Sequence, residues 1–313
     1  MITDKAGKIV DGLWYFGRQE SGIYLLEGSS CSMIISGGMN WILPEVLDQM
    51  ERFGIDEQRI EKLLILHAHF DHIGLVPFFK RRLPRLTVYA SAPAWRIINN
   101  PEAIDTINRF SRTTAEYRDR AHVLDIYDCA WRFDVGGVTV AEGDVIDCGD
   151  NDVRIIETPG HSSCSVSAYV PAKKALFPSD GGGIPHRGGI IASGNSNYTL
   201  FQQSLEKLSS LEVDLLGADH GGYMTGEDAR RFIGRTIDVA RDFRKLMEEL
   251  YCRMGSVDSA VDELIIQARA SRPDFFLPSR ILRGVYGQML RHVAAMMDEG
   301  RQEGPHVPGE PGT

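Results

Sequence analysis

The apolar positions near the start of the chain come in short runs separated by glycine and serine. Runs at residues 13–16, 23–26 and 32–35 predict three strands of an antiparallel meander. Residues 44–53 instead carry apolar side chains at helical spacing, begin with a proline and are followed by Gly54, so they predict a helix. The opening segment therefore combines strands with one helix.

An alternation of strands and helices follows. Residues 62–66, Lys-Leu-Leu-Ile-Leu, form a continuous apolar run that is typical of a strand covered on both faces. A helix at 73–82 and a strand at 86–89 come next, and residues 92–128 have the mostly helical, more polar pattern of an insertion between sheet elements. This order predicts an α/β fold in which helices cover the sheet.

The second half of the chain is rich in strands and then becomes wholly helical. Strands are predicted at 138–141, 153–157, 165–170, 174–177 and 213–216, with a helix at 200–208. From about residue 227 onward, apolar side chains fall at helical spacing, and the last residues are rich in glycine and proline. We therefore predict a domain at 1–225, a helical C-terminal region at 226–298 and a flexible tail at 299–313.

Composition places the chain among ordinary globular proteins. It has 313 residues, of which 43% are hydrophobic and 25% charged, and its net charge of -9 argues against a nucleic-acid partner. No run reaches the roughly 18 apolar residues that a membrane helix needs, and the N-terminal residues lack the pattern of a secretory signal. The five cysteines form no Cys-x-x-Cys pair, so we expect reduced thiols, a cytoplasmic location and no membrane partner.

The candidate chemistry is concentrated in the sequence His-Ala-His-Phe-Asp-His, directly after the predicted strand at 62–66. His67 and His69 are two residues apart, so on an extended segment both side chains face the same way. Asp71 and His72 lie one step further, where the chain turns into a helix. In open α/β sheets, ligands bind at the carboxyl ends of the strands. The spacing therefore suits two metal ions that both take ligands from one short loop.

Three further polar side chains follow predicted strands in the same way. His161 ends a Thr-Pro-Gly-His sequence after strand 153–157, and Asp180 lies in Phe-Pro-Ser-Asp-Gly after strand 174–177. His220 follows strand 213–216 in Ala-Asp-His-Gly-Gly. Loops held by a rigid sheet are preferred positions for functional groups. These residues are therefore the candidates for the remaining ligands of a site with two metals.

These four motifs, in this order, resemble the metal-binding loops of the metallo-β-lactamase superfamily over about residues 10–225. The resemblance implies an αββα sandwich, here with a helical insertion and an all-helical C-terminal appendage. It also implies two divalent metal ions, for which zinc, iron and manganese all suit the ligands. By that resemblance, the first metal is held by His67, His69 and His161, the second by Asp71, His72 and His220, and Asp180 bridges both.

The helical C-terminal region resembles the branch of the superfamily formed by glyoxalase II and the PqsE-like thioesterases. This resemblance implies hydrolysis of a small acyl substrate, either an acyl-coenzyme A-like thioester or an activated ester, by a metal-bound hydroxide. Asp180 would be catalytic as the bridge and Asp71 as a proton acceptor. A thiolate, with a pKa of about 8.5, leaves with little protonation. The apolar stripe of the last helices is expected to be core or a homodimer interface.

Two other functions stay open at this stage. The helical appendage is compatible with a regulatory protein that keeps the metal site but works through protein contacts. The metal ligands are also compatible with a metal-dependent phosphodiesterase or nuclease, against which the net charge of -9 argues weakly.

Some residues near the motifs have two interpretations. Asp219, where the family usually has glycine, is interpreted first as a solvated loop carboxylate and alternatively as a hydrogen-bond acceptor for a ligand histidine. The glycine-rich segment 181–198 is expected to be an irregular loop that lines or covers the site. Within it, His186 and Arg187 are either solvated surface residues or contacts for an anionic substrate group.

Overall fold

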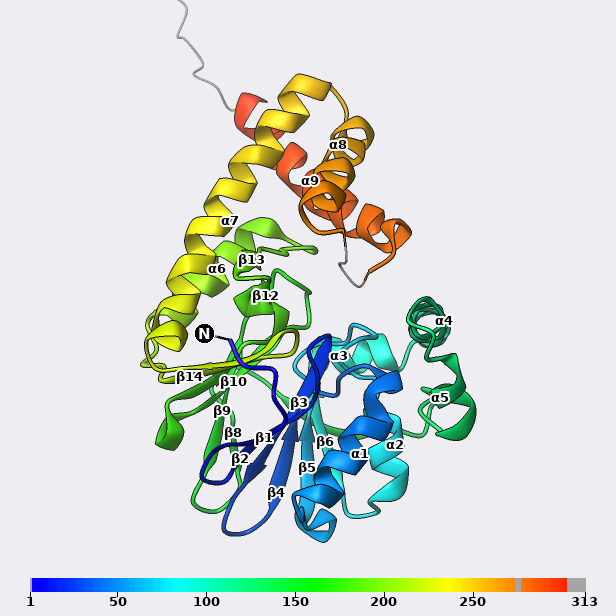
Figure 1. Cartoon of the computed structure of the whole chain (residues 1–313). Coiled ribbons are helices and arrows are strands. Elements are labelled where there is room, and N and C mark those ends of the chain that lie inside the picture. The colour runs from blue at the N-terminus through cyan, green and yellow to red at the C-terminus, as the bar shows by residue number, and fades with distance from the viewer. Residues whose placement is uncertain (1, 274–276, 303–313) are drawn as a thin grey trace, which may run out of the picture. The chain divides into compact units, whose positions relative to one another are not determined.

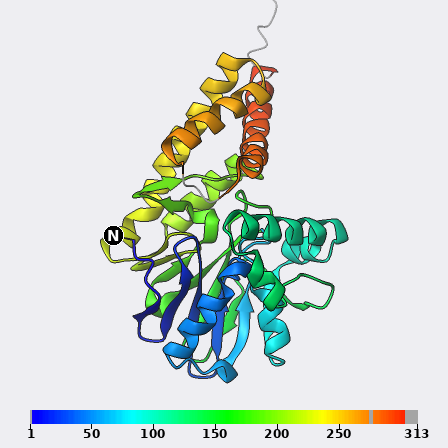
Figure 2. The ribbon, with the colours of Figure 1, turned by 45° about the vertical axis from the view of Figure 1, so that its right-hand side comes forward.

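The computed structural model describes residues 2–273 and 277–302, and two β-sheets form the centre of its N-terminal part (Figure 1). The sheets lie face to face, with helices on their outer sides (Figures 1 and 2). The predicted αββα sandwich with a helical insertion and C-terminal helices is confirmed. Of the predicted tail at 299–313, residues 303–313 lie outside the described residues.

The first sheet has seven strands in chain order. They are β1 (Gly7–Val10), β2 (Leu13–Arg18), β3 (Ser21–Glu27), β4 (Ser32–Ile35), β5 (Ile60–Leu64), β6 (Thr87–Ser91) and β7 (Gly137–Val140). β1 to β4 form the predicted antiparallel meander, whereas β4 to β7 are parallel. Parallel neighbours need crossover connections. Helix α1 (Leu43–Arg52) joins β4 to β5, with the short 3-10 turns η1 (Asn40–Ile42) and η2 (Glu57–Arg59) on either side of it, and helix α2 (Val76–Arg82) joins β5 to β6.

The second sheet has six strands in the order β15-β14-β11-β10-β9-β8. They are β8 (Val145–Asp147), β9 (Asp152–Glu157), β10 (Val166–Val170), β11 (Ala175–Phe177), β14 (Leu215–Ala218) and β15 (Gly222–Thr225). β11 and β14 pair in parallel, and helix α6 (Tyr198–Ser209) lies in the connection between them. Two 3-10 turns flank β11, at η3 (Pro171–Lys173) and η4 (Ser179–Gly182).

Three helices fill the predicted insertion between β6 and β7. They are α3 (Ala92–Ile98), α4 (Pro101–Tyr117) and α5 (Ala121–Ile126). Ser91 and Asn100, which precede α3 and α4, accept hydrogen bonds from backbone amides of the first turn of each helix. The insertion leaves the sheet intact, because β6 and β7 on either side of it pair directly as parallel neighbours.

The core of the sandwich lies between the sheets and takes side chains from both. The rings of Tyr24 in β3 and Phe177 in β11 have centroids 4.9 Å apart. A Cβ on Gly217 would lie 2.5 Å from the Phe177 ring, so this close approach requires glycine. The buried Tyr24 hydroxyl donates to the Ala218 carbonyl at 2.7 Å. These contacts fix β11 and β14, and with them the loops that follow, against the first sheet.

The segment expected to be an irregular loop contains a hairpin. Strands β12 (Ile184–His186) and β13 (Gly189–Ile191) pair antiparallel and are joined by Arg187 and Gly188. Both turn residues have positive φ angles, of 49° and 77°, as in a two-residue type I′ turn. The expectation of irregular structure over 181–198 is therefore wrong in this part, because Arg-Gly is not the Asn-Gly or Asp-Gly pair that usually signals such a turn.

The described chain ends in three helices, α7 (Glu227–Met254), α8 (Val257–Ser271) and α9 (Ser279–Gln302). Packing divides the chain into two compact units, Met1–Ala240 and Arg241–Thr313. The first half of α7 therefore packs with the sandwich unit, whereas the sequence places a boundary at 226. The second unit has its own buried apolar side chains, among them Met247, Leu250, Val261, Leu264, Met289, Leu290 and Val293.

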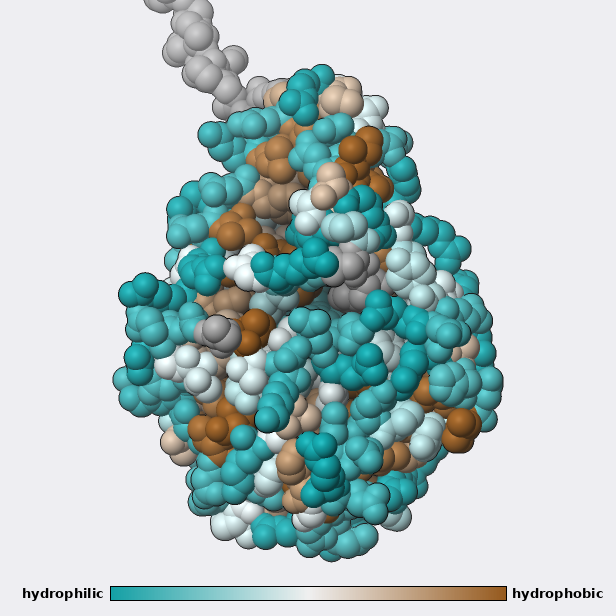
Figure 3. Space-filling view, viewed as in Figure 1, coloured by the Kyte–Doolittle hydropathy of each residue, from teal (hydrophilic) through white to brown (hydrophobic). Residues whose placement is uncertain are grey.

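The described surface is mainly hydrophilic. On the face shown in Figure 3, hydrophobic residues occur in several separate patches among hydrophilic ones. Four of the cysteines are buried thiols outside disulfides, namely Cys31, Cys129, Cys148 and Cys164. Within residues 2–273 and 277–302, the length and apolar character that a membrane-spanning helix requires are not found in any helix.

Candidate metal centre

The His-Ala-His-Phe-Asp-His segment forms a compact loop after β5. Beyond it, the Gly74 amide donates to the Gly38 carbonyl at 2.7 Å. A Cβ on Gly74 would lie 2.3 Å from the Asn40 amide nitrogen, so two backbone segments are in direct contact here. Because these tertiary contacts hold the chain after the motif, α2 begins at Val76 and not at residue 73 as predicted. The loop is thereby fixed on the end of the sheet.

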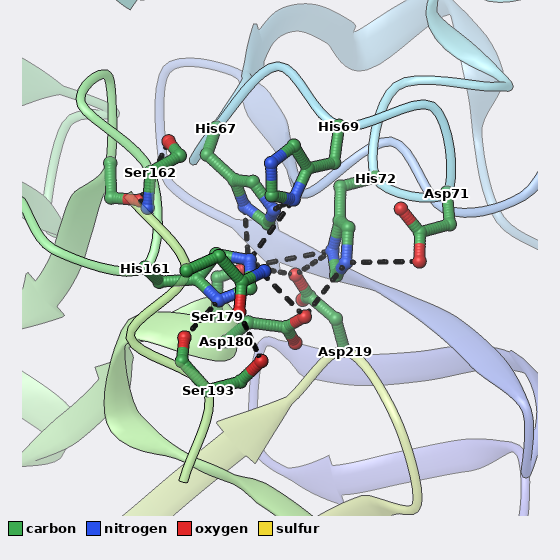
Figure 4. A network of polar contacts seen from close by, with 12 residues as sticks. His67, His69, Asp71, His72, His161, Ser162, Ser179, Asp180, Ser193 and Asp219 are labelled. Carbon is green, nitrogen blue, oxygen red and sulfur yellow. Dashed lines mark hydrogen bonds and ion pairs between the residues drawn. The ribbon is translucent and has the colours of Figure 1, made fainter. Parts of the chain in front are cut away.

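The structure brings together three of the predicted ligands, His67, His69 and His161, which we call the first set. His67 Nε2 lies 3.1 Å from His69 Nδ1, and His161 Nε2 lies 3.0 Å from the same His69 nitrogen. These nitrogens lie close enough together to hold one metal ion. Figure 4 shows the three imidazoles turned toward a common point.

The second set consists of Asp71, His72 and His220. Asp71 Oδ2 lies 3.7 Å from both His72 Nε2 and His220 Nε2. The Asp180 carboxylate lies between the two sets. Its Oδ2 is 3.3 Å from His72 Nε2 and 3.6 Å from His161 Nε2, and its Oδ1 is 3.7 Å from His220 Nε2. All seven residues predicted as ligands therefore converge, and their role as ligands belongs to the proposal below.

Backbone carbonyls orient two of the histidines. His161 Nδ1 donates to the Ser193 carbonyl, and His220 Nδ1 donates to the Glu20 carbonyl, each at 2.6 Å. A hydrogen bond at Nδ1 places the proton there and leaves the Nε2 lone pair free to bind a cation. The sequence does not reveal these acceptors, because Glu20 and Ser193 act through the main chain and lie far from the motifs they serve.

Side chains orient His67 and His72, whose Nε2 atoms also face the cluster. His72 Nδ1 donates to Asp219 Oδ2 at 2.7 Å, and His67 Nδ1 lies 3.2 Å from the Ser179 hydroxyl. Asp219 is only 2% exposed, so the interpretation as a solvated loop carboxylate is wrong. The alternative agrees with the structure in that Asp219 accepts a hydrogen bond from His72. Sequence analysis missed Ser179, whose only signal is its position directly before Asp180.

Burial and charge divide the histidines into two kinds. Burial lowers the pKa of both His69 and His161 from 6.5 to about 4, so these imidazoles are neutral near pH 7. Burial also opposes protonation of His72, but the nearby carboxylates, led by Asp180, outweigh it and raise the pKa of His72 well above its usual value. In the protein without metal, His72 is therefore expected to be the protonated, positively charged histidine near pH 7, whereas His69 and His161 are neutral.

This division predicts different pH dependences for the two sets. Between pH 8 and pH 6, cation affinity at the first set is expected to stay nearly constant, because His69 and His161 bind protons only near pH 4. Affinity at the second set is expected to rise with pH, because a cation must displace the proton of His72. Calorimetric metal titrations at pH 6 and pH 8, in buffers of different ionisation enthalpy, measure both affinities and the protons released. Equal pH slopes for the two cations would contradict the assignment.

The donors of the cluster fit divalent cations. Imidazole nitrogens and carboxylate oxygens are suitable ligands for zinc, iron and manganese. Asp219 Oδ1 is buried and has no hydrogen-bond partner among the described residues. Such a buried, half-satisfied carboxylate is costly unless positive charge lies nearby. The charge that bound cations would bring to this cluster meets that requirement.

The two hairpin residues considered as substrate contacts, His186 and Arg187, are less buried than most residues of the two sets. His186 is partly buried at the end of β12, and Arg187 is exposed at the turn. Contact of either residue with an anionic substrate group stays a prediction.

The geometry agrees with a comparison of the sequence with known families. A sequence profile of the metallo-beta-lactamase superfamily matches residues 18–220, a region that contains both sets and Asp180. The chain belongs to the metallo-beta-lactamase superfamily. Proteins of this superfamily are mostly hydrolases, and the cluster described here occupies the end of the sandwich formed by loops of both sheets.

Individual proteins of the superfamily share limited sequence identity with this chain. The acyl-coenzyme A thioesterase MBLAC2 of Bos taurus is 27% identical over 53% of this chain and 60% of its own length. A hydroxyacylglutathione hydrolase of Brucella anthropi is 34% identical over 38% of this chain and 44% of its own length. The solved structure of a metallo-beta-lactamase family protein from Thermus thermophilus has a TM-score of 0.66 at 17% identity, covering 94% of this chain and 95% of that one. That likeness shows a shared fold.

Proposed function

We propose that the chain is a binuclear metal-dependent hydrolase that cleaves acyl thioesters of the coenzyme A type. The observation that carries the proposal is the position of Asp180. Its two carboxylate oxygens lie within 4 Å of histidine nitrogens of both sets, 3.6 Å from His161 Nε2 and 3.7 Å from His220 Nε2. One carboxylate between two sets of inward-facing donors is the arrangement that a pair of cations requires.

The first set would hold one cation through three imidazoles, and the second set would hold the other through two imidazoles and the Asp71 carboxylate. Asp180 would contribute an oxygen to each. Two divalent ions there, of zinc, iron or manganese, would polarise an acyl carbonyl and lower the pKa of a coordinated water toward neutrality. The hydrogen bonds at Nδ1 hold four of the imidazoles in place before any cation binds.

The side chains themselves perform two tasks in the proposed reaction. Asp180 would hold the two sets at a fixed separation, and the Asp71 carboxylate would accept the proton that the attacking water releases. The thioester then releases a thiolate, whose pKa of about 8.5 lets it depart without a proton from the enzyme. An amine leaving group must be protonated before it departs, whereas a thiolate need not be, so a thioester makes the smaller demand on the site. The chemistry of the site therefore favours a thioester over an amide.

Two of the relatives support the same substrate class. The proteins named above as an acyl-coenzyme A thioesterase and as a hydroxyacylglutathione hydrolase act, by those names, on thioesters, and each matches only part of this chain. The proposal extends that chemistry to this protein.

The test begins with full-length protein stripped of metal by a chelator and reloaded with zinc, iron or manganese. We expect two metal ions per chain and a kcat/KM for an acyl-coenzyme A that exceeds that of the matched oxygen ester about 10-fold or more. An acyl-glutathione and a bis-aryl phosphate complete the panel. The variant His122→Ala, which removes a histidine of the insertion helix α5, serves as the control and is expected to behave as the parent. Fewer than one metal per chain, or cleavage of the phosphodiester alone, would overturn the proposal.

A further inference from the structure

We propose that Ser179 and Asp219 act together as a positioning pair that connects the two sets and determines the affinity for the second cation. The inference rests on the proposed function, because it concerns the cations of the same site. It assigns roles to two side chains that lie outside the cluster of seven ligands.

The pair forms a continuous hydrogen-bonded chain between the sets (Figure 4). His72 of the second set donates from Nδ1 to Asp219 Oδ2 at 2.7 Å. The Ser179 hydroxyl donates to the same Asp219 oxygen, and its own oxygen lies 3.2 Å from Nδ1 of His67, which belongs to the first set. One carboxylate oxygen is thus bound directly to one ligand histidine and reaches another through a single hydroxyl.

The backbone of Ser179 indicates that the hydroxyl is what matters at this position. Ser179 has a φ angle of 49°, in the left-handed region that favours glycine. It sits in η4 between β11 and Asp180 and is 2% exposed. A glycine would adopt this conformation without strain, but it could not bridge His67 and Asp219. Serine is therefore strained here and also bonded on both sides.

The buried Asp219 carboxylate needs positive charge nearby, which cations bound to this cluster would supply. Its side chain is almost fully buried, and Oδ1 has no hydrogen-bond partner within residues 2–273 and 277–302. Together with Asp71 and Asp180 it brings three buried carboxylates to the site. Two divalent cations and three carboxylates leave one positive charge, which one anionic oxygen of water or substrate neutralises. Without Asp219 a second positive charge would be left uncompensated.

The geometry also predicts an asymmetry between the sets. Asp219 hydrogen-bonds His72 directly and therefore makes that imidazole a stronger donor to the second cation. It acts on His67 only through Ser179. Loss of the carboxylate is consequently expected to weaken the second cation much more than the first, whereas loss of the hydroxyl alone has a smaller effect.

The experiment titrates cobalt(II) into chelator-treated full-length protein and follows both calorimetry and the visible absorption of the bound cobalt. For Asp219→Asn we expect the second cobalt to bind about 10- to 100-fold more weakly, with a changed ligand-field spectrum, and the first cobalt to bind within about 3-fold of the parent. For Ser179→Gly we expect the second cobalt to bind about 3- to 10-fold more weakly. The Tm is expected to stay near that of the parent, because relief of the backbone strain offsets the loss of the two buried hydrogen bonds.

Two variants serve as matched controls. Ser162→Ala removes a buried hydroxyl that bonds to Cys164 and Ser165, and Asp214→Asn removes a carboxylate that pairs with Arg230 just before β14. Both are expected to bind two cobalt ions with the parent spectrum.

The outcomes distinguish this inference from the proposed function. In one outcome, the parent binds two cobalt ions, Asp219→Asn selectively weakens the second, and the parent cleaves no thioester. That result would support the positioning pair and contradict the proposed thioesterase activity. Cobalt binding unchanged in Asp219→Asn, or weakened equally at both sets, would overturn the pair. If Asp219→Asn fails to fold, Ser179→Gly decides the matter, since a parent-like cobalt titration in that folded variant would also overturn it.

Discussion

Replacing Asp180 with asparagine is expected to lower thioester turnover about 1000-fold and to reduce the bound metal from two ions to one or fewer. The change keeps the size of the side chain but removes the negative charge that lies between both sets, 3.3 Å from His72 Nε2 and 3.6 Å from His161 Nε2. A factor of 1000 corresponds to about 4 kcal/mol of lost transition-state stabilisation, in line with the several kcal/mol that a metal ion supplies. Steady-state kinetics and elemental analysis of the same preparation measure both effects.

The matched control for this variant is Asp134→Asn. Asp134 forms an exposed ion pair with Arg81 and lies outside the metal cluster, so its loss is expected to leave turnover and metal content unchanged. Asp180→Asn protein that retained two metal ions and more than about a tenth of the parent turnover would remove Asp180 from the bridging position.

Replacing Phe177 with alanine is expected to lower the free energy of unfolding of the sandwich unit by about 3–5 kcal/mol. Phe177 is fully buried and packs on Tyr24 from the opposite sheet, with ring centroids 4.9 Å apart. Alanine would leave a cavity that the rigid strands cannot close. Urea unfolding followed by tryptophan fluorescence reports on this unit, because all four tryptophans precede residue 240.

The control for the core variant is Phe133→Ala, which removes the same ring from a side chain that is 67% exposed. We expect a change within about 0.5 kcal/mol for this variant, as is usual at surface positions. A loss below about 1 kcal/mol for Phe177→Ala would mean that the two sheets repack around the gap, and the tight packing beneath the metal loops would then not be required.

Much of the site was predictable because the clustered histidines and aspartates follow strands. His161, Asp180 and His220 each come shortly after a strand that the hydrophobic pattern predicts, and the pattern of a buried strand before His67 is equally clear. The strand itself, β5, runs over Ile60–Leu64 and not 62–66, so the motif begins slightly further from the sheet than expected. Strand and loop order therefore locate the clustered residues, although they do not give the exact ends of the elements.

Long-range contacts account for what the sequence did not reveal. The start of α2 depends on backbone contacts between Gly74 and Gly38, and no local pattern contains that information. The carbonyl of Glu20, which orients His220, is 200 residues away from it along the chain. It is chemically identical to any other backbone carbonyl. The burial of Asp219 is equally invisible in the local sequence, because its partner His72 lies far away along the chain.

The origin of the seven clustered residues has a consequence for the stability of the fold. The loop that carries His67 to His72 follows β5 in the first sheet, whereas His161, Asp180 and His220 follow strands of the second sheet. A cation held jointly by His72 and Asp180, as proposed, would therefore be a removable cross-link between the halves of the sandwich. The halves cannot separate without releasing it, so the heat tolerance of the protein is expected to follow the supply of metal in its surroundings.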